Sequence, residues 1–169
     1  MKKIVFLAIM LVAMAGAVVA QVSISTVDKV EVTDQMFMDM AVSQATENVK
    51  AGGKPCGAVV ILNGAVRSAG KSSETSTAEE TAILKSRRKN LANAVIYTVN
   101  EPTTAAYNAI CRAGVDAVYF VNSRNEVIAA GVYTAEDYDD AKIDSTLTAV
   151  PMSSMTYSDA IAILKDYKK

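Results

Sequence analysis

Apolar residues along the chain follow two different periods, and the changes between them predict the order of the elements. Helical spacing predicts a first helix over 34–50, capped by Thr33 or Asp34 and ended by Gly52-Gly53. Continuous β-branched runs predict strands at 56–62, 65–70, 94–99, 115–121 and 147–150. Further helices are expected at 77–89, 102–113, 135–142 and 157–167.

This order of elements predicts an α/β fold. Asn63-Gly64 lies between the first two strands and is a strong signal for a tight hairpin. The later strands are each separated by a helix, and the helix that begins at Pro102 should join two parallel strands. We therefore expect a three-layer α/β/α domain with one mixed sheet of about five strands.

The first twenty residues have the composition of a signal peptide. Two lysines precede the apolar segment 4–12, and small residues follow up to Ala20. A membrane anchor is the alternative, but Gly16 interrupts a short apolar run. We predict a signal peptide at 1–20, an extended leader at 21–33 and one domain at 34–169. The mature protein would be exported, periplasmic or secreted, and free of the membrane after cleavage.

Charge and composition restrict the chemistry. The 169 residues carry a net charge of −1, which argues against a general nucleic-acid binder. The chain has no histidine, so the commonest zinc ligand and the commonest general base are both missing. Export would permit a disulfide between Cys56 and Cys111 but does not require one, because buried free cysteine is also common.

Local sequence resembles the cytidine deaminase-like superfamily. Residues 48–60, with Pro55-Cys56-Gly57-Ala58, look like the end of that family's first helix and its first strand. Residues 118–124 look like the strand that follows its second zinc half-site. The similarity covers roughly residues 34–125 and is greatest to the guanine deaminase and tRNA-adenosine deaminase branch. It implies the cytidine deaminase-like fold and a homo-oligomer like those of its relatives.

The family's zinc pattern is His-x-Glu followed by Pro-Cys-x-x-Cys. Carried over by position, the metal ligands fall at Thr77, Thr103 and Ala106, with the proton-shuttling carboxylate at Glu79 and the proline at Pro102. Threonine is a poor zinc ligand and alanine is none. The resemblance therefore implies a zinc enzyme, whereas the residues predict no metal and no cofactor.

Ordinary helix chemistry also accounts for these positions. Thr77 and Glu80 fit a capping box at the start of a helix. Pro102 suits the first turn of the next helix. A carboxylate such as Glu79 is favoured near a helix N-terminus by the helix dipole.

Zinc supplies most of the activation of the attacking water in this family, so its loss bears directly on catalysis. Zinc lowers the pKa of a bound water from about 15.7 to about 7. At about 1.36 kcal/mol per pKa unit, losing that activation removes on the order of 10 kcal/mol. We therefore expect an exported, non-catalytic deaminase-fold protein that binds a small polar or nucleobase-like ligand or a partner. The alternative is a zinc-dependent nucleobase or nucleoside deaminase, of guanine or cytidine type, with an atypical site.

Overall fold

The computed structural model describes residues 25–143, 147–152 and 158–167. Residues 36–169 form one compact unit, and residues 25–35 form the first part of helix α2. The helices are α2 (Ser25–Lys50), α3 (Ala78–Ser86), α4 (Thr104–Ala113), α5 (Arg124–Ala129) and α6 (Ser158–Tyr167). The strands are β1 (Gly57–Leu62), β2 (Ala65–Lys71), β3 (Ala94–Asn100), β4 (Ala117–Asn122) and β5 (Thr148–Pro151). Two 3₁₀ helices, η1 (Ala135–Asp137) and η2 (Asp140–Lys142), precede β5.

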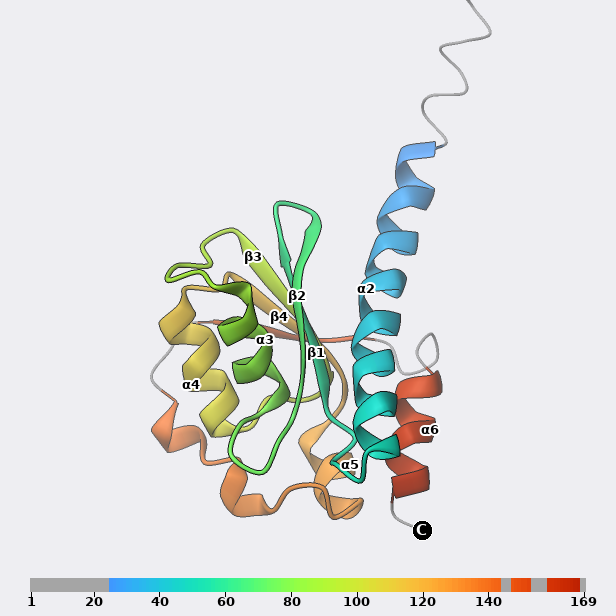
Figure 1. Ribbon diagram of the computed structural model, residues 1–169, viewed down its shortest axis with the longest axis vertical. Helices are drawn as coiled ribbons and strands as arrows, with labels where there is room; N and C mark the ends of the chain where they lie inside the picture. Colours follow the sequence, from blue (N-terminus) through green and yellow to red (C-terminus); the bar gives the residue numbers. More distant parts are fainter. Residues whose placement is uncertain (1–24, 144–146, 153–157, 168–169) are drawn as a thin grey trace, which may run out of the picture. The chain divides into compact units, whose positions relative to one another are not determined.

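The five strands form one mixed sheet in the order β2-β1-β3-β4-β5 (Figure 1). Strand β1 is antiparallel to both β2 and β3, whereas β3, β4 and β5 run parallel. Helix α4 joins β3 to β4 and makes the expected parallel βαβ unit. The predicted mixed sheet is confirmed, and the parallel strands bring their carboxyl ends to the same edge.

Helices cover both faces of the sheet, as expected for three layers (Figure 1). The side chains of β1 alternate between the two cores: Ala58 and Val60 pack with α3 and α4, and Val59 and Ile61 pack with α2 and α6. This alternation follows from the two-residue period of a strand. It fixes which face of each strand can contribute side chains to a site beneath α3 and α4.

Two glycines allow helices to approach the sheet closely. A Cβ atom at Gly57 would lie 2.1 Å from the backbone oxygen of Ala41 in α2. A Cβ atom at Gly70 would lie 2.4 Å from the backbone oxygen of Ala78 and 2.4 Å from the backbone nitrogen of Ala82 in α3. Any side chain there would displace a helix, because these contacts are with backbone atoms.

The hairpin between β1 and β2 is also confirmed. Asn63 and Gly64 both have positive φ angles, of 53° and 74°. Two-residue hairpins need this backbone conformation, which asparagine and glycine adopt at low cost.

Several expected boundaries are wrong. Helix α2 begins at Ser25, so residues 25–33 are helical rather than extended, and Thr33 and Asp34 lie inside the helix instead of capping it. The β-branched residues in this stretch each disfavour a helix by only a few tenths of a kcal/mol, which does not end it. Helix α5 was not expected, and 135–142 forms two 3₁₀ turns in place of one helix.

The signal peptide predicted at 1–20 lies outside the described residues. Among the helices that the structure describes, none is both long and apolar enough to cross a bilayer.

We predict that Gly70→Ala lowers the free energy of unfolding by about 1–3 kcal/mol, the usual cost of overpacking a tight contact. The new methyl group would press against the backbone of α3 at Ala78 and Ala82. Urea denaturation measures the effect. The control Ala65→Val adds bulk at an exposed position of the same strand and should change stability by less than about 0.5 kcal/mol. Equal stability of Gly70→Ala and wild type would contradict this packing.

Candidate active site

Buried polar residues gather where the parallel strands end. On the α3 side of β3, the apolar residues Ala94 and Ile96 are followed on the same face by Thr98 and Asn100, which are also buried. Asn122 pairs in register with Asn100 across the parallel strands. The carboxyl edge of a parallel sheet is a common place for ligands, so this cluster marks a candidate site.

The N-terminus of α3 has the geometry expected from the sequence. The Thr77 hydroxyl accepts a hydrogen bond from the backbone N–H of Glu80 at 3.2 Å, and the Glu80 carboxylate accepts from the backbone N–H of Thr77 at 2.9 Å. This reciprocal capping box is confirmed. It fixes the first turn of α3, and with it the direction of Glu79.

Glu79 is a buried acid, with 6% of its surface exposed. Its carboxyl Oε1 accepts a hydrogen bond from the Thr98 hydroxyl of β3. Burial raises the pKa of Glu79 above its ordinary value, and the hydrogen bond from Thr98 opposes this only in part. Burial therefore favours the neutral carboxyl, a form that can donate a proton.

Cys56 lies near this acid and hydrogen-bonds with a buried amide and a tyrosine hydroxyl. The Asn100 Nδ2 group donates to the backbone oxygen of Pro55 at 2.9 Å and to Cys56 Sγ at 3.3 Å. Cys56 Sγ in turn lies 3.6 Å from the Tyr133 hydroxyl and hydrogen-bonds with it. The pKa of the Cys56 thiol is raised to about 11, chiefly because the thiol is buried; the hydrogen bond with Tyr133 lowers this pKa, and the charge of Glu79 raises it.

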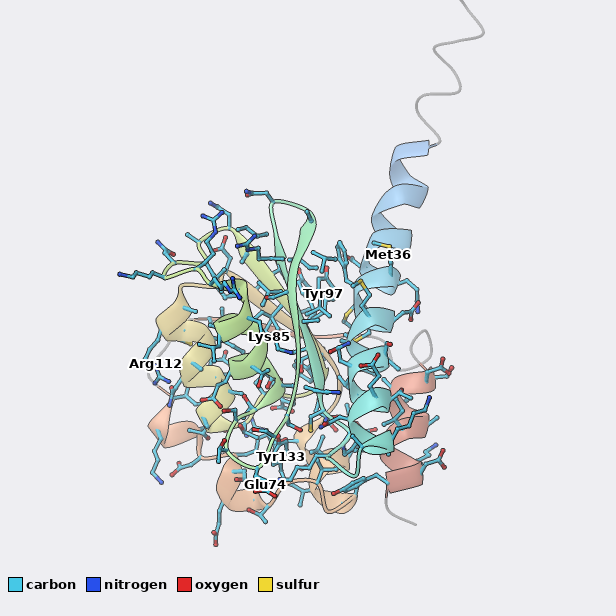
Figure 2. All side chains as sticks on the ribbon, viewed as in Figure 1. Met36, Glu74, Lys85, Tyr97, Arg112 and Tyr133 are labelled. Carbon is cyan, nitrogen blue, oxygen red and sulfur yellow. The ribbon has the colours of Figure 1, made fainter. Side chains whose placement is uncertain are left out.

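Two tyrosines on the segment after α5 form an aromatic wall over the site. The Tyr133 and Tyr138 rings meet edge to face with centroids 6.4 Å apart, and the Lys54 ammonium lies 4.2 Å from the centre of the Tyr133 ring. In the view of Figure 2, Tyr133 lies below helix α3, at the same end of the domain as Glu74. Burial raises the pKa of Tyr133, and the negative charges of Cys56 and Glu79 act in the same direction.

A cavity of about 320 Å³ opens on the other side of Tyr138. The Tyr138 hydroxyl donates to the backbone oxygen of Glu101 at 3.2 Å. Arg124 lines this cavity and forms ion pairs with two other lining residues, Glu101 at 2.6 Å and Asp140 at 2.9 Å. Pro102 also lines this cavity, so the second carried-over motif borders a hollow of the size that holds small ligands.

The other carried-over positions lie at the N-terminus of α4 and are buried. The Thr103 hydroxyl accepts a hydrogen bond from the backbone N–H of Ala106 at 3.3 Å and caps the helix. Thr103 and Ala106 are 4% and 1% exposed. The structure thus uses both threonines of the two motifs as helix caps.

These residues do not fit the zinc ion that the resemblance implies. Within the described ranges, no three side chains of histidine, cysteine, aspartate or glutamate lie together in a way that could hold a metal. The hydroxyl oxygens of Thr77 and Thr103 are each engaged by a backbone amide, and Ala106 has no donor atom. We therefore derive no chemical step through zinc.

Comparison with known proteins identifies the family. Residues 31–122 match the family described as the cytidine and deoxycytidylate deaminase zinc-binding region. This match spans more than half of the chain. The chain belongs to this family. The resemblance stated from the sequence is confirmed, as is the deaminase fold.

Individual relatives agree with this assignment. The guanine deaminase of Bacillus subtilis (strain 168) is 27% identical over 139 residues, which is 76% of this chain and 89% of that protein. A mutant of the protein NE0047 in complex with 8-azaguanine superposes with a TM-score of 0.69 at 18% identity, covering 80% and 84% of the two chains. A tRNA deaminase that carries out A-to-I editing superposes with a TM-score of 0.60 at 21% identity, covering 76% and 98%. The last two show the shared fold.

These comparisons contradict the prediction of a non-catalytic protein with a binding or interaction role. The matched family and the Bacillus subtilis relative are deaminases, and they favour the alternative, a nucleobase deaminase with an atypical site. The prediction rested on the replaced ligand positions Thr77, Thr103 and Ala106, on the absence of histidine and on the lost activation by zinc. It gave too little weight to the family-wide match and to Glu79, which keeps a buried place of its own in the site.

Sequence reasoning missed Thr98, Asn100, Tyr133 and Tyr138. The first two carried a readable signal, because polar residues at alternate positions ended an otherwise apolar strand. Nothing in the local sequence distinguished the two tyrosines. Their place over Glu79 depends on how the segment after α5 returns to the sheet.

We predict that Glu79→Gln stabilises the fold increasingly as pH rises. Below the ordinary glutamate pKa, Glu79 is protonated in both the folded and the unfolded chain. Above it, the unfolded chain loses the proton first, so wild type loses stability until the pH passes the raised folded pKa. Urea denaturation across this window should show the gap between variant and wild type widening and then levelling. The control Glu80→Gln removes a carboxylate from the same helix and shows whether the effect is specific to Glu79. A stability difference between Glu79→Gln and wild type that does not change with pH would contradict the prediction.

The two cysteines are both free, and Cys56 is buried whereas Cys111 is partly exposed. With a pKa of about 11, the Cys56 thiol stays protonated at neutral pH and should react slowly. We predict that iodoacetamide modifies Cys111 in the native protein and Cys56 only after unfolding. Mass spectrometry of the digested protein measures both sites. Faster modification of Cys56, or a disulfide in the unreduced protein, would contradict this arrangement.

Proposed function

We propose that this chain is a nucleobase deaminase of the guanine deaminase type, in which Glu79 transfers protons. The observation that carries the proposal is the buried carboxyl of Glu79, held by Thr98 at the capped N-terminus of α3. Membership of the deaminase family and the similarity to the Bacillus subtilis guanine deaminase support it.

The chemistry needs a group that both gives and takes a proton. Hydrolytic deamination adds water to the ring carbon that carries the amino group, and the carbon–nitrogen bond then breaks to release ammonia. A neutral Glu79 carboxyl can protonate the adjacent ring nitrogen as the oxygen–carbon bond forms. Its carboxylate can then take a proton of the attacking water and pass it to the departing nitrogen. As ammonia leaves, the new hydroxyl on the ring carbon becomes a carbonyl and its proton returns to Glu79.

The surroundings of Glu79 suit a flat, polar ligand. The Tyr133 and Tyr138 rings provide aromatic surface, and Tyr138 also lines the 320 Å³ cavity. The Asn100 Oδ1 atom accepts one hydrogen bond, from Asn122, and an amide oxygen can accept a second. We propose that the ligand is a nucleobase that enters through this cavity and displaces the Tyr138 ring.

The residues at the ligand positions lead us to propose a site that catalyses deamination without bound zinc. Catalysis should then be slower, because zinc no longer activates the water. Water must be activated by Glu79 and by the substrate alone, since the residues at the ligand positions offer no metal donors. We therefore expect turnover to be slower than in zinc-containing relatives. Export, assembly into a homo-oligomer and the lack of nucleic-acid binding remain predictions of the sequence.

The test is ammonia release from the purified full chain with guanine, cytosine, adenine and cytidine, followed over hours at high protein concentration. We expect release with at least one base, and loss of at least about a hundredfold in Glu79→Gln, the usual contribution of a general acid–base group. Metal analysis of the same sample should find no stoichiometric zinc.

The control is Glu80→Gln, which removes a carboxylate from the same turn of α3 and keeps the capping box, because glutamine serves equally at that position. It should retain the activity. Absence of ammonia with all four substrates would refute the proposed function. Equal loss in both variants would refute the specific role of Glu79.

A further inference from the structure

The segment 132–143, which follows α5 and is called the strap below, forms one wall of the 320 Å³ cavity. Three residues of the strap line the cavity, Tyr138, Asp140 and Ile143. The opposite wall comes from the end of β3 and from the first turns of α4 and α5. Part of the strap therefore spans a hollow instead of resting on a packed core. We propose that the ion pair between Arg124 and Asp140 is a latch that keeps the strap closed, and that breaking it opens the site beneath.

Arg124 ties the strap to the body of the domain through its guanidinium group. Its Nη1 atom donates to both carboxylate oxygens of Asp140, at 3.0 and 2.9 Å. Glu101 holds Arg124 from the other side, because it accepts from the Nε atom at 2.6 Å and from the backbone N–H at 2.8 Å. The guanidinium also lies 5.5 Å from the centre of the Tyr138 ring. One side chain thus reaches the strap at two points.

The latch is exposed enough to be broken. The side chains of Arg124 and Asp140 are 34% and 68% exposed, so water and salt screen their attraction. Further hydrogen bonds reach the strap at Asp139, which exchanges two bonds with the Thr104 hydroxyl, at 2.8 and 3.2 Å. The Arg124–Asp140 pair is therefore the part of the closure that salt and a charge-removing substitution should weaken.

Gly131 provides a hinge at the start of the strap. Its φ angle is 73°, and a Cβ atom built there would meet nothing within 4 Å. Neighbouring atoms therefore do not restrain this backbone position. A single glycine that ends α5 can take up the change in backbone angles that an opening strap needs.

The position of Arg124 between two carboxylates makes the latch asymmetric. Substitution of Asp140 removes the attraction to the strap and leaves Arg124 paired with Glu101. Substitution of Arg124 leaves the carboxylates of Glu101 and Asp140 near each other without the cation between them, and like charges repel. Arg124→Gln should therefore open the strap further than Asp140→Asn.

Opening the strap should expose Cys56. The Tyr133 hydroxyl on the strap hydrogen-bonds with Cys56 Sγ at 3.6 Å, and the Tyr133 ring meets the Tyr138 ring edge to face. Movement of Tyr138 removes the support of Tyr133 and so uncovers the thiol. That the opening admits a nucleobase rests on the proposed function, whereas the latch and the exposure of Cys56 can be measured without any substrate.

Hydrogen–deuterium exchange of the full chain, read by mass spectrometry, tests the latch. We expect Asp140→Asn to accelerate exchange of peptides from 132–143 about fivefold, which corresponds to about 1 kcal/mol. Raising the salt concentration from about 50 mM to about 500 mM should accelerate this exchange in wild type and much less in Asp140→Asn. The control Glu136→Gln removes the same charge from an exposed strap position and should have no effect. Unchanged exchange in Asp140→Asn, or an equal effect of Glu136→Gln, would overturn the latch.

Labelling of Cys56 by iodoacetamide tests whether the open strap gives access to the site. Its rate relative to Cys111 in the same sample should rise about fivefold in Asp140→Asn, in proportion to the exchange. Strap opening exposes little surface, so the rate should hardly change in dilute urea, whereas labelling through global unfolding would rise steeply. Unchanged labelling, or a steep dependence on urea, would refute the gating of the site. Neither measurement needs ammonia release, so a chain without deaminase activity would still show whether the latch exists.

Discussion

The burial of one carboxyl group, that of Glu79, constrains the rest of the site. An acid in this position is tolerated because the Thr98 hydroxyl donates to it and because the first turn of α3 is fixed by the Thr77–Glu80 capping box. Burial also raises the pKa of Glu79, and the pKa of Cys56 is raised by that thiol's own burial and by the charge of Glu79. A strand, a helix cap and a buried thiol are therefore coupled through a single proton-binding group.

This arrangement depends on close packing that two glycines allow. Gly70 lets the backbone of α3 lie directly on β2, which brings the first turn of the helix to the end of β3. Gly57 allows the same approach of α2 on the opposite face. The burial of Glu79 thus depends on how closely α3 packs on the sheet, whereas the capping box sets only the direction of its side chain.

The chain shows that a deaminase fold and its metal ligands are separable. The family match spans residues 31–122, yet the ligand positions hold two threonines used as helix caps and an alanine. The replaced ligand positions, the absence of histidine and the lost zinc activation predicted a non-catalytic protein. The comparisons contradict that prediction, because the family match and the similarity to a guanine deaminase each extend over more than half of the chain.

Local pattern was enough to determine the strands, the Asn63-Gly64 hairpin and the cap at Thr77, because each depends on neighbours within a few residues. Local pattern did not predict the start of α2, because the weak helix propensity of the β-branched residues before residue 34 suggested an extended segment. Only the tertiary structure decided that Tyr133 bonds Cys56 and that Asn122 meets Asn100. Both depend on segments distant in sequence meeting at the carboxyl edge of the sheet, and no local pattern encodes such a meeting.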